Sequence, residues 1–452
     1  MGAGRNERGA AGTFLLMAVV LALAAVVAVV NIGQPDDEAL DQVQLGRATP
    51  RTNDVADAAR QSLLSYWARE LPAVYQQDFE ALAGGFQPKT PDSPAFSCGG
   101  QTQTYEDLRG NAFYCGGSDD YIAWDAATLF PQLSERYGGI APAIVLAHEV
   151  GHAVQARAGI DAPSVVQELQ ADCFAGSWTR FAETSTEDPV SLSDGALDSA
   201  VATVLTLRDQ PGRAATAPQA HGLGFDRVNA FQTGYEQGAG RCAKLPTEGV
   251  VTTELPFRTQ AEAETGGDLP FEQAVQVLTD SLDSYWTAVL PRLADGGTFQ
   301  PPTVRPADST DVPECPSGQD PTGLAADYCP ASTTIDWSVP RLLSVHEQIG
   351  DLGTGAALGD AWAEAAQNQA GLETAGQRAG LQRDCFTGAW IASLAGENLA
   401  RSPLSPGDLD EALTAIVAAS FTDDARSMDR GGAFARTRSL RTGLFENLSG
   451  CV

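Results

Sequence analysis

The stretch AHEVGH, residues 147–152, decides how this chain is interpreted, because it holds two of only four histidines. His148 and His152 are four residues apart, so on a helix both imidazoles lie on one face and can reach the same metal ion. Glu149 would then lie beside a metal-bound water, as in the HExxH arrangement. The alternative is a helix with a chance polar stripe, which the scarcity of histidine disfavours.

The flanking residues predict two helices. Pro142 suits the first turn of a helix, where its missing N–H is not needed. Gly159 and Pro163 are typical of the end of that helix. Ser164, with Gln167 three residues later, predicts a capping box that starts a second helix.

Glu168 and Asp172 lie on one face of this second helix. A catalytic zinc site takes three protein ligands and leaves one position for water. If the two helices pack antiparallel, Glu168 is the natural third ligand. Asp172 can then accept a hydrogen bond from a ligand histidine and fix its tautomer. The alternative is an exposed acidic face.

The runs AHEVGHAVQ and ELQADCFAGSW resemble the bacterial putative neutral zinc metallopeptidase family over roughly residues 60–242. This resemblance implies a gluzincin-like site in which His148, His152 and Glu168 bind Zn²⁺ and Glu149 is the general base. It also implies hydrolysis of peptide bonds in a peptide or protein substrate by a zinc-activated water.

His221 precedes Gly222, and the family has a similar His-Gly run followed by an arginine, here Arg227. A histidine near the zinc-bound water could stabilise the tetrahedral oxyanion and so be catalytic. It could equally cap a helix or hold the fold. The sequence leaves both roles open.

An internal repeat divides the chain. SLLSYWARELP (62–72) recurs as SLDSYWTAVLP (281–291), and DCFAGSW (172–178) recurs as DCFTGAW (384–390). The matches keep their order, which predicts two tandem copies. We expect a peptidase domain at 57–244, a linker at 245–270 and a second copy at 271–452. The Tyr-Trp pairs in the first repeat are expected to be core aromatics.

The second copy is expected to lack the metal site. In VHEQIG, His346 aligns with His148, and Gly350 falls in the place of His152. Gly380 falls in the place of Glu168. Glycine offers no ligand, so this copy is predicted to be catalytically dead. It could stabilise the first copy, bind substrate or regulate it by binding a partner.

Residues 14–30 contain no charge and follow Arg5 and Arg8. They predict a transmembrane signal anchor at 13–32, with a cytoplasmic N-terminus at 1–12 and a flexible tether at 33–56. The bulk of the chain would then lie outside the cytoplasm, anchored to the cell membrane. Cleavage of this segment, giving a secreted protein, is the alternative.

Eight cysteines, four per copy, agree with an oxidising compartment. The closest pairs in sequence suggest local loops, and the duplication suggests one shared pattern. The predicted disulfides are Cys98–Cys115, Cys173–Cys242, Cys315–Cys329 and Cys385–Cys451.

A net charge of -30 disfavours binding to nucleic acid phosphates. The expected fold is α+β and mostly helical, a zincin-like domain that is duplicated after the transmembrane helix. By resemblance, a strand at Tyr121–Trp124 would lie beside the cleft and could pair with substrate. The competing function is a non-catalytic cell-envelope scaffold or binding protein that retains a zinc site. The oligomeric state is not indicated by the sequence.

Overall fold

The structure is a computed structural model that describes residues 52–186, 188–190, 192–193, 195–212, 220–253, 255–294, 296–308, 325–395, 404–421 and 430–452. The predicted N-terminus at 1–12, the transmembrane segment at 13–32 and most of the tether at 33–56 lie outside these residues. Within them, no helix is both long enough and apolar enough to cross a membrane.

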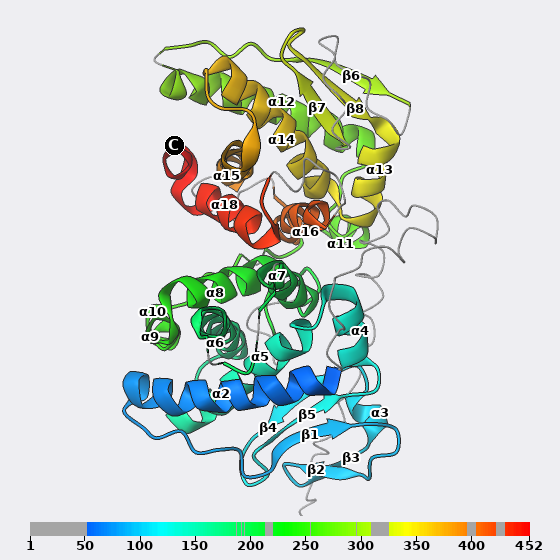
Figure 1. Cartoon of the computed structure of the whole chain (residues 1–452). Helices are drawn as coiled ribbons and strands as arrows, with labels where there is room; N and C mark the ends of the chain where they lie inside the picture. The colour runs from blue at the N-terminus through cyan, green and yellow to red at the C-terminus, as the bar shows by residue number, and fades with distance from the viewer. Residues whose placement is uncertain are drawn as a thin grey trace, which may run out of the picture.

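The first half of the chain has a long helix, a small mixed sheet with a hairpin, and then a series of helices (Figure 1). Its elements are α2 (Thr52–Tyr75), β1 (Gly85–Lys89), β2 (Phe96–Cys98), β3 (Gln101–Gln103), α3 (Tyr105–Leu108), β4 (Ala112–Cys115), β5 (Tyr121–Asp125), α4 (Leu129–Tyr137), α5 (Ala141–Ala158), α6 (Ser164–Thr184), α7 (Ala196–Thr206), α8 (Gly224–Gln237), α9 (Ala239–Cys242) and α10 (Leu245–Glu248).

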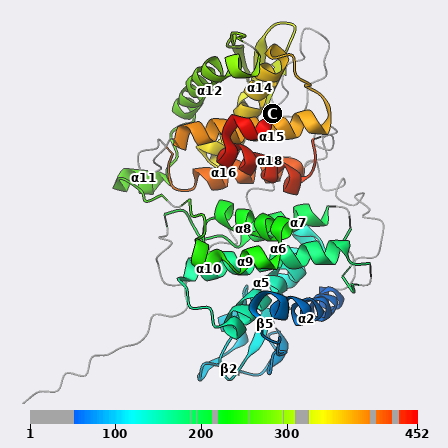
Figure 2. The same cartoon turned by 90° about the vertical axis from the view of Figure 1, so that its left-hand side faces the viewer.

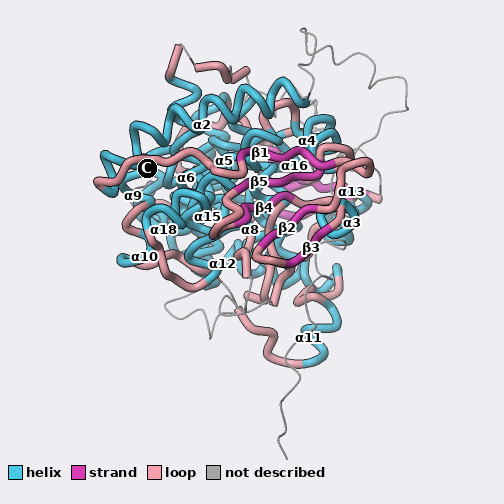
Figure 3. The backbone as a smooth tube through the Cα atoms, turned by 90° about the horizontal axis from the view of Figure 1, so that it is seen from below, coloured by secondary structure: helices cyan, strands magenta, loops and turns pink. Residues whose placement is uncertain are grey.

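Strand β5 is the centre of the first sheet, whose order is β1-β5-β4. It pairs in parallel with β1 and antiparallel with β4, and all five of its residues are buried. Ile122 and Trp124 pack into the helical core, whereas Tyr121 and Ala123 belong to a separate cluster that includes Phe96 and Cys98 of β2. The β2–β3 hairpin lies next to β4 (Figure 3). Because both edges of β5 are already paired, the expectation that this strand pairs with substrate is wrong.

Helix α5 begins and ends as the sequence predicts. Pro142 lies in its first turn, and Gly159 caps its end with a φ of 65°, a left-handed conformation that glycine adopts without strain. Helix α6 begins at Ser164, but the predicted capping box does not form. Instead, the Ser164 hydroxyl donates to the carbonyl oxygen of Ala220, and the Gln167 amide donates to that of Ala162.

Helices α5 and α6 approach each other closely at the HExxH motif. A Cβ atom on Gly151 would lie 2.9 Å from the Cα atom of Ala171. Real Cβ atoms do not approach other atoms this closely, so the close approach requires glycine here. The short distance between the helix axes allows side chains of α6 to reach those of α5.

The second half contains another mixed sheet and another set of helices. Its elements are α11 (Gln260–Thr265), α12 (Phe271–Leu293), β6 (Thr303–Ala307), β7 (Ala326–Cys329), β8 (Thr334–Ser338), α13 (Val339–Gln348), α14 (Asp351–Gln369), α15 (Gly376–Ala395), α16 (Asp408–Ser420), α18 (Ala433–Glu446) and the 3₁₀ helix η4 (Asn447–Cys451). The central strand β8 pairs in parallel with β6 and antiparallel with β7, the same pattern as in the first sheet. The expected mostly helical α+β class is confirmed.

The two sheets lie at opposite ends of the molecule, and helices α7 and α8 face α16 and α18 between them (Figures 1 and 2). Trp67 and Trp286 are fully buried, Tyr66 is buried and Tyr285 is half-buried, so these aromatics belong to the core as expected.

Disulfide bonds connect Cys98 to Cys115, Cys173 to Cys242, and Cys385 to Cys451. These are three of the pairs that the sequence predicts. Cys315, which belongs to the fourth predicted pair, lies outside the described residues. The second bond ties α6 to α9, and the third ties α15 to η4 at the end of the second half.

Candidate metal centre

Three side chains from α5 and α6 converge on one point. The Nε2 atoms of His148 and His152 are 3.2 Å apart. Glu168 Oε2 lies 3.1 Å from His148 Nε2, and Glu168 Oε1 lies 3.5 Å from His152 Nε2. The structure therefore brings together the three residues that the sequence proposes as ligands.

This arrangement fits a tetrahedral metal ion. Ligand atoms about 2.0–2.1 Å from zinc, at a tetrahedral angle, lie roughly 3.3 Å from each other. The separation of the two Nε2 atoms, and the distance from each to the Glu168 oxygen that faces it, lie near that value. Glu168 Oε2 is also buried without a hydrogen bond of good geometry, a costly state that a metal ion would relieve.

Asp172 and Arg227 orient the first histidine. Asp172 Oδ1 lies 2.8 Å from His148 Nδ1, so Nδ1–H donates and Nε2 is left to face the cluster. Arg227, which is buried, donates to both oxygens of Asp172 at 2.7 and 2.9 Å. Burial opposes ionisation of Asp172, but Arg227 and His148 lower its pKa overall. The sequence predicts the role of Asp172, whereas that of Arg227 depends on the fold.

The carboxylates of Asp172 and Glu168 also favour a positive charge where the two histidines meet. Burial lowers the pKa of His148, but Asp172 and Glu168 outweigh it and raise this pKa to about 10. The same carboxylates would favour a bound cation.

Gln155 orients the second histidine, and sequence reasoning missed it. Its Oε1 lies 2.9 Å from His152 Nδ1. Its Nε2 donates to the Gln167 carbonyl oxygen at 2.6 Å and to Gln170 Oε1 at 3.1 Å. Because the amide nitrogen is held by two acceptors, Oε1 must face His152. The available signal was its spacing, since Gln155 lies one helical turn after His152.

Glu149 is buried beside the cluster, with 7% of its surface exposed. Burial lowers the pKa of His152, but Glu168 and, more weakly, Glu149 raise it overall. Within the part of the chain that the structure describes, the Glu149 carboxylate has no hydrogen-bond partner. Its carboxylate is therefore available to a further group beside the cluster.

His221 lies in the loop before α8 and is not one of the three clustered residues. Its Nδ1 is 3.1 Å from Asp209 Oδ1, and 43% of its side chain is exposed. Asp209 also accepts hydrogen bonds from the backbone N–H groups of His221 and Gly222. This contact leaves Nε2 of His221 as the nitrogen available to another group.

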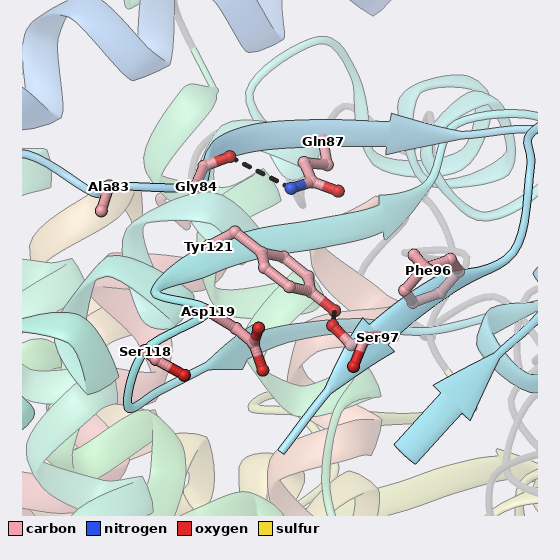
Figure 4. Close-up of a pocket in the computed structure, with 8 residues that line it drawn as sticks. All are labelled: Ala83, Gly84, Gln87, Phe96, Ser97, Ser118, Asp119 and Tyr121. Carbon is pink, nitrogen blue, oxygen red and sulfur yellow. Dashed lines mark hydrogen bonds between the residues drawn. The ribbon is translucent and has the colours of Figure 1, made fainter. Parts of the chain in front are cut away.

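A pocket of about 350 Å³ lies beside the first sheet, on the side of the β2–β3 hairpin (Figure 4). Its lining residues are Ala83, Gly84, Gln87, Phe96, Ser97, Ser118, Asp119 and Tyr121. None of them belongs to α5 or α6, so this pocket is separate from the metal centre.

The second half repeats the hydrogen bonds of Gln155 on helix α14. Gln367 Nε2 donates to the Ala379 carbonyl oxygen and to Gln382 Oε1, both on α15. His148 and His152 lie seven and three residues before Gln155. The residues at the same distances before Gln367 are Asp360, in the place of His148, and Glu364, in the place of His152.

The expected alignment of His346 with His148 is therefore wrong. His346 lies on α13, one helix too early. On α15, Arg436 donates to both oxygens of Asp384, as Arg227 does to Asp172 on α6.

An arginine fills the equivalent space in the second half. Arg430 donates to both oxygens of Asp360, and Arg383 donates to the same carboxylate at 3.2 Å. A Cβ atom on Gly380 would lie 2.9 Å from the Cγ of Arg430. The missing side chain at 380 thus makes room for the aliphatic part of Arg430, whose guanidinium group pairs with Asp360.

A second group of carboxylates also comes within the spacing of metal ligands: Asp268, Asp351 and Glu411. Burial, followed by neighbouring carboxylates, raises the pKa of Glu411 well above its usual range. The main-chain N–H of Leu352 donates to Glu411, so the group is built into the contact between α14 and α16.

Residues 1–244 match the family described as putative neutral zinc metallopeptidase. Curated relatives include the uncharacterized protein Rv2575 of Mycobacterium tuberculosis, which is 29% identical over 28% of this chain and 52% of its own length. The uncharacterized protein YpfJ of Escherichia coli K12 is 28% identical over 28% of this chain and 50% of its own length. The chain thus spans about half the length of these relatives. No solved structure matches it significantly.

Proposed function

The chain belongs to the putative neutral zinc metallopeptidase family, and we propose that its first half hydrolyses peptide bonds at the α5–α6 centre. The observation that carries this proposal is the convergence of His148, His152 and Glu168 within 3.1–3.5 Å of one another, with Glu149 buried beside them. A purely structural zinc site would have no use for Glu149. This favours an enzyme over a scaffold that merely retains zinc.

His148, His152 and Glu168 would hold the metal, which supplies a Lewis acid and lowers the pKa of a water toward about 7. Glu149 accepts the proton of the attacking water and passes it to the leaving amine. Asp172 and Gln155 keep both imidazoles in the tautomer whose Nε2 carries the lone pair. The chain itself thus contributes three ligands in fixed orientations and the carboxylate of Glu149, which makes no hydrogen bond to another described residue.

His221 is proposed to stabilise the oxyanion of the tetrahedral intermediate. Support comes from the second half, where Arg430 lies six residues before Arg436, just as His221 lies six before Arg227. The side chain of Arg430 extends to Asp360, the counterpart of His148. In the second half, a side chain from this loop position therefore faces the equivalent centre.

We also propose that the second half arose by duplication and holds no zinc. Its matching sheet topology and its Gln367 hydrogen bonds support duplication. Arg430 supports the loss of zinc, because a fixed guanidinium group at the former metal position excludes a second cation by charge and by volume.

Anchoring by residues 13–32, with the bulk of the protein outside the cytoplasm, remains our proposal for localisation. The uncharged run at 14–30 and the disulfide bonds support it.

The test is Glu149→Gln in the full chain, assayed on a mixture of peptides and analysed for zinc. The variant should lose hydrolysis at least a hundredfold and keep its zinc, because Glu149 is the base and not a ligand. Glu347→Gln is the matched control, since this exposed glutamate follows His346 in the same dipeptide; it should change neither property. Full hydrolysis by Glu149→Gln would refute the proposed base.

A further inference from the structure

We propose that Asp410, in the second half, is a positioning residue for the metal centre of the first half. This inference rests on the proposed function, because it assigns the second half a role in the same centre. Asp410 does not touch any of the three proposed metal ligands. It acts through helix α8, which carries Arg227.

Asp410 caps the N-terminus of α8 from across the interface between the halves. Its Oδ2 accepts the N–H of Gly224 at 2.8 Å, and its Oδ1 accepts the N–H of Phe225 at 2.7 Å. Leu223, the residue before the helix, provides no side-chain cap. The first amides of a helix have no partner within it, and a carboxylate there also favours the positive end of the helix dipole.

The first turn of α8 leads directly to the metal centre. Arg227 lies in that turn and donates to both oxygens of Asp172, which in turn accepts from His148. Arg227 is 1% exposed, so water cannot replace the hydrogen bonds of its guanidinium group if the turn moves. A displaced Arg227 would release Asp172, and His148 would lose its fixed tautomer.

Asp410 is itself held firmly. It is buried, and its Oδ2 lies 3.5 Å from Arg208 Nε. Removing this carboxylate would leave two buried amides without an acceptor and would remove the ion-pair partner of Arg208, which also donates to the Leu205 carbonyl oxygen. Each unsatisfied buried group is costly, so the first turn of α8 would fray or move.

A similar contact, with one helix amide instead of two, runs from the first half to the second and provides an internal control. Asp198, on α7 of the first half, accepts the N–H of Phe434 at 2.8 Å, at the start of α18. Helix α18 carries Arg436, which pairs with Asp384. Each half thus caps the arginine-bearing helix of the other, but only the Asp410 contact leads to the proposed zinc ligands.

The experiment compares Asp410→Ala with Asp198→Ala in the full chain, using amide hydrogen exchange and zinc affinity. Asp410→Ala should speed exchange in the first turn of α8 at least tenfold in the metal-free protein. It should also weaken zinc binding, measured by competition with a chelator, by roughly 10–100-fold. Asp198→Ala should speed exchange in α18 and leave zinc affinity within twofold. Asp410→Asn, whose carbonyl oxygen can accept one amide, should recover part of both losses.

Wild-type zinc affinity in Asp410→Ala, or an equal loss in Asp198→Ala, would overturn the inference. If Asp410→Ala does not fold, Asp410→Asn decides: it must weaken zinc binding more than Asp198→Asn does. A wild-type chain that binds zinc but cleaves no peptide would refute the proposed function alone, because the exchange and affinity comparisons need no hydrolysis.

Discussion

At the scale of single residues, the ligands could be predicted from spacing, whereas the groups that orient them could not. His148, His152 and Glu168 follow from helical periodicity and the chemistry of zinc. Gln155 and Arg227 act through tertiary hydrogen bonds to other helices. A glutamine or arginine in a sequence does not reveal such partners.

The role of Gln155 can be tested by Gln155→Leu, which keeps the volume and removes the acceptor for His152 Nδ1. We expect zinc affinity to fall by roughly 10–100-fold, as is usual when a group that orients a ligand is removed. Gln367→Leu changes the counterpart on α14 and should leave zinc affinity unchanged. Equal affinities of Gln155→Leu and the wild-type chain in a chelator competition would contradict this role.

At the scale of elements, the sequence predicts α5 and α6 correctly but misassigns their counterparts. The dipeptide His346–Glu347 resembles the start of the motif, yet α13 precedes α14, the helix that occupies the equivalent position. The decisive features are the Gln367 hydrogen bonds and the guanidinium of Arg430, which arise only on folding. The place of β5 at the centre of its sheet likewise depends on strand pairing that a single strand's sequence does not specify.

Asp360 forms buried ion pairs with Arg430 and Arg383. We therefore predict that Asp360→Asn lowers the free energy of unfolding by an amount that depends on pH. Burial raises the pKa of Asp360, but Arg430 and Arg383 lower it to about 2, below the value of about 3.9 in an unfolded chain. The charge therefore stabilises the fold above pH ~4, and this contribution is lost as the pH falls toward 2. At pH 7 the variant should lose about 3–5 kcal/mol, measured by urea unfolding, and the difference should shrink at lower pH. An unchanged unfolding midpoint at pH 7 would refute this account.

The contact between α14 and α16 predicts the opposite dependence of stability on pH. Four carboxylates meet there and have raised pKa values: Asp268, Asp351, Asp408 and Glu411. Burial is the first cause at each, and the cations that act on them are His346 and Arg258. Because the folded pKa values exceed the unfolded ones, the stabilising contribution is present at low pH and is lost as the pH rises through them.

Glu411→Gln should therefore raise the melting temperature at pH 7, and the gain should disappear toward pH 4. The measurement is thermal unfolding in a chelator across that range. Glu272→Gln, at an exposed position at the start of α12, is the control and should show no such trend. A lower melting temperature for Glu411→Gln at pH 7 would contradict the account.

At the scale of the whole molecule, two halves with the same sheet topology meet through helices that cap one another (Figure 1). The sequence repeat predicts the two units, but not their contact, because Asp198 and Asp410 are ordinary helix residues until the halves meet. We propose that the first half binds the metal, whereas the guanidinium group of Arg430 takes the equivalent place in the second half.

Zinc content per chain tests this central claim most directly. Elemental analysis of the purified full-length protein should give one zinc per chain, and Glu168→Ala should give none. Two tightly bound zinc ions per chain, or one that remains in Glu168→Ala, would contradict the account.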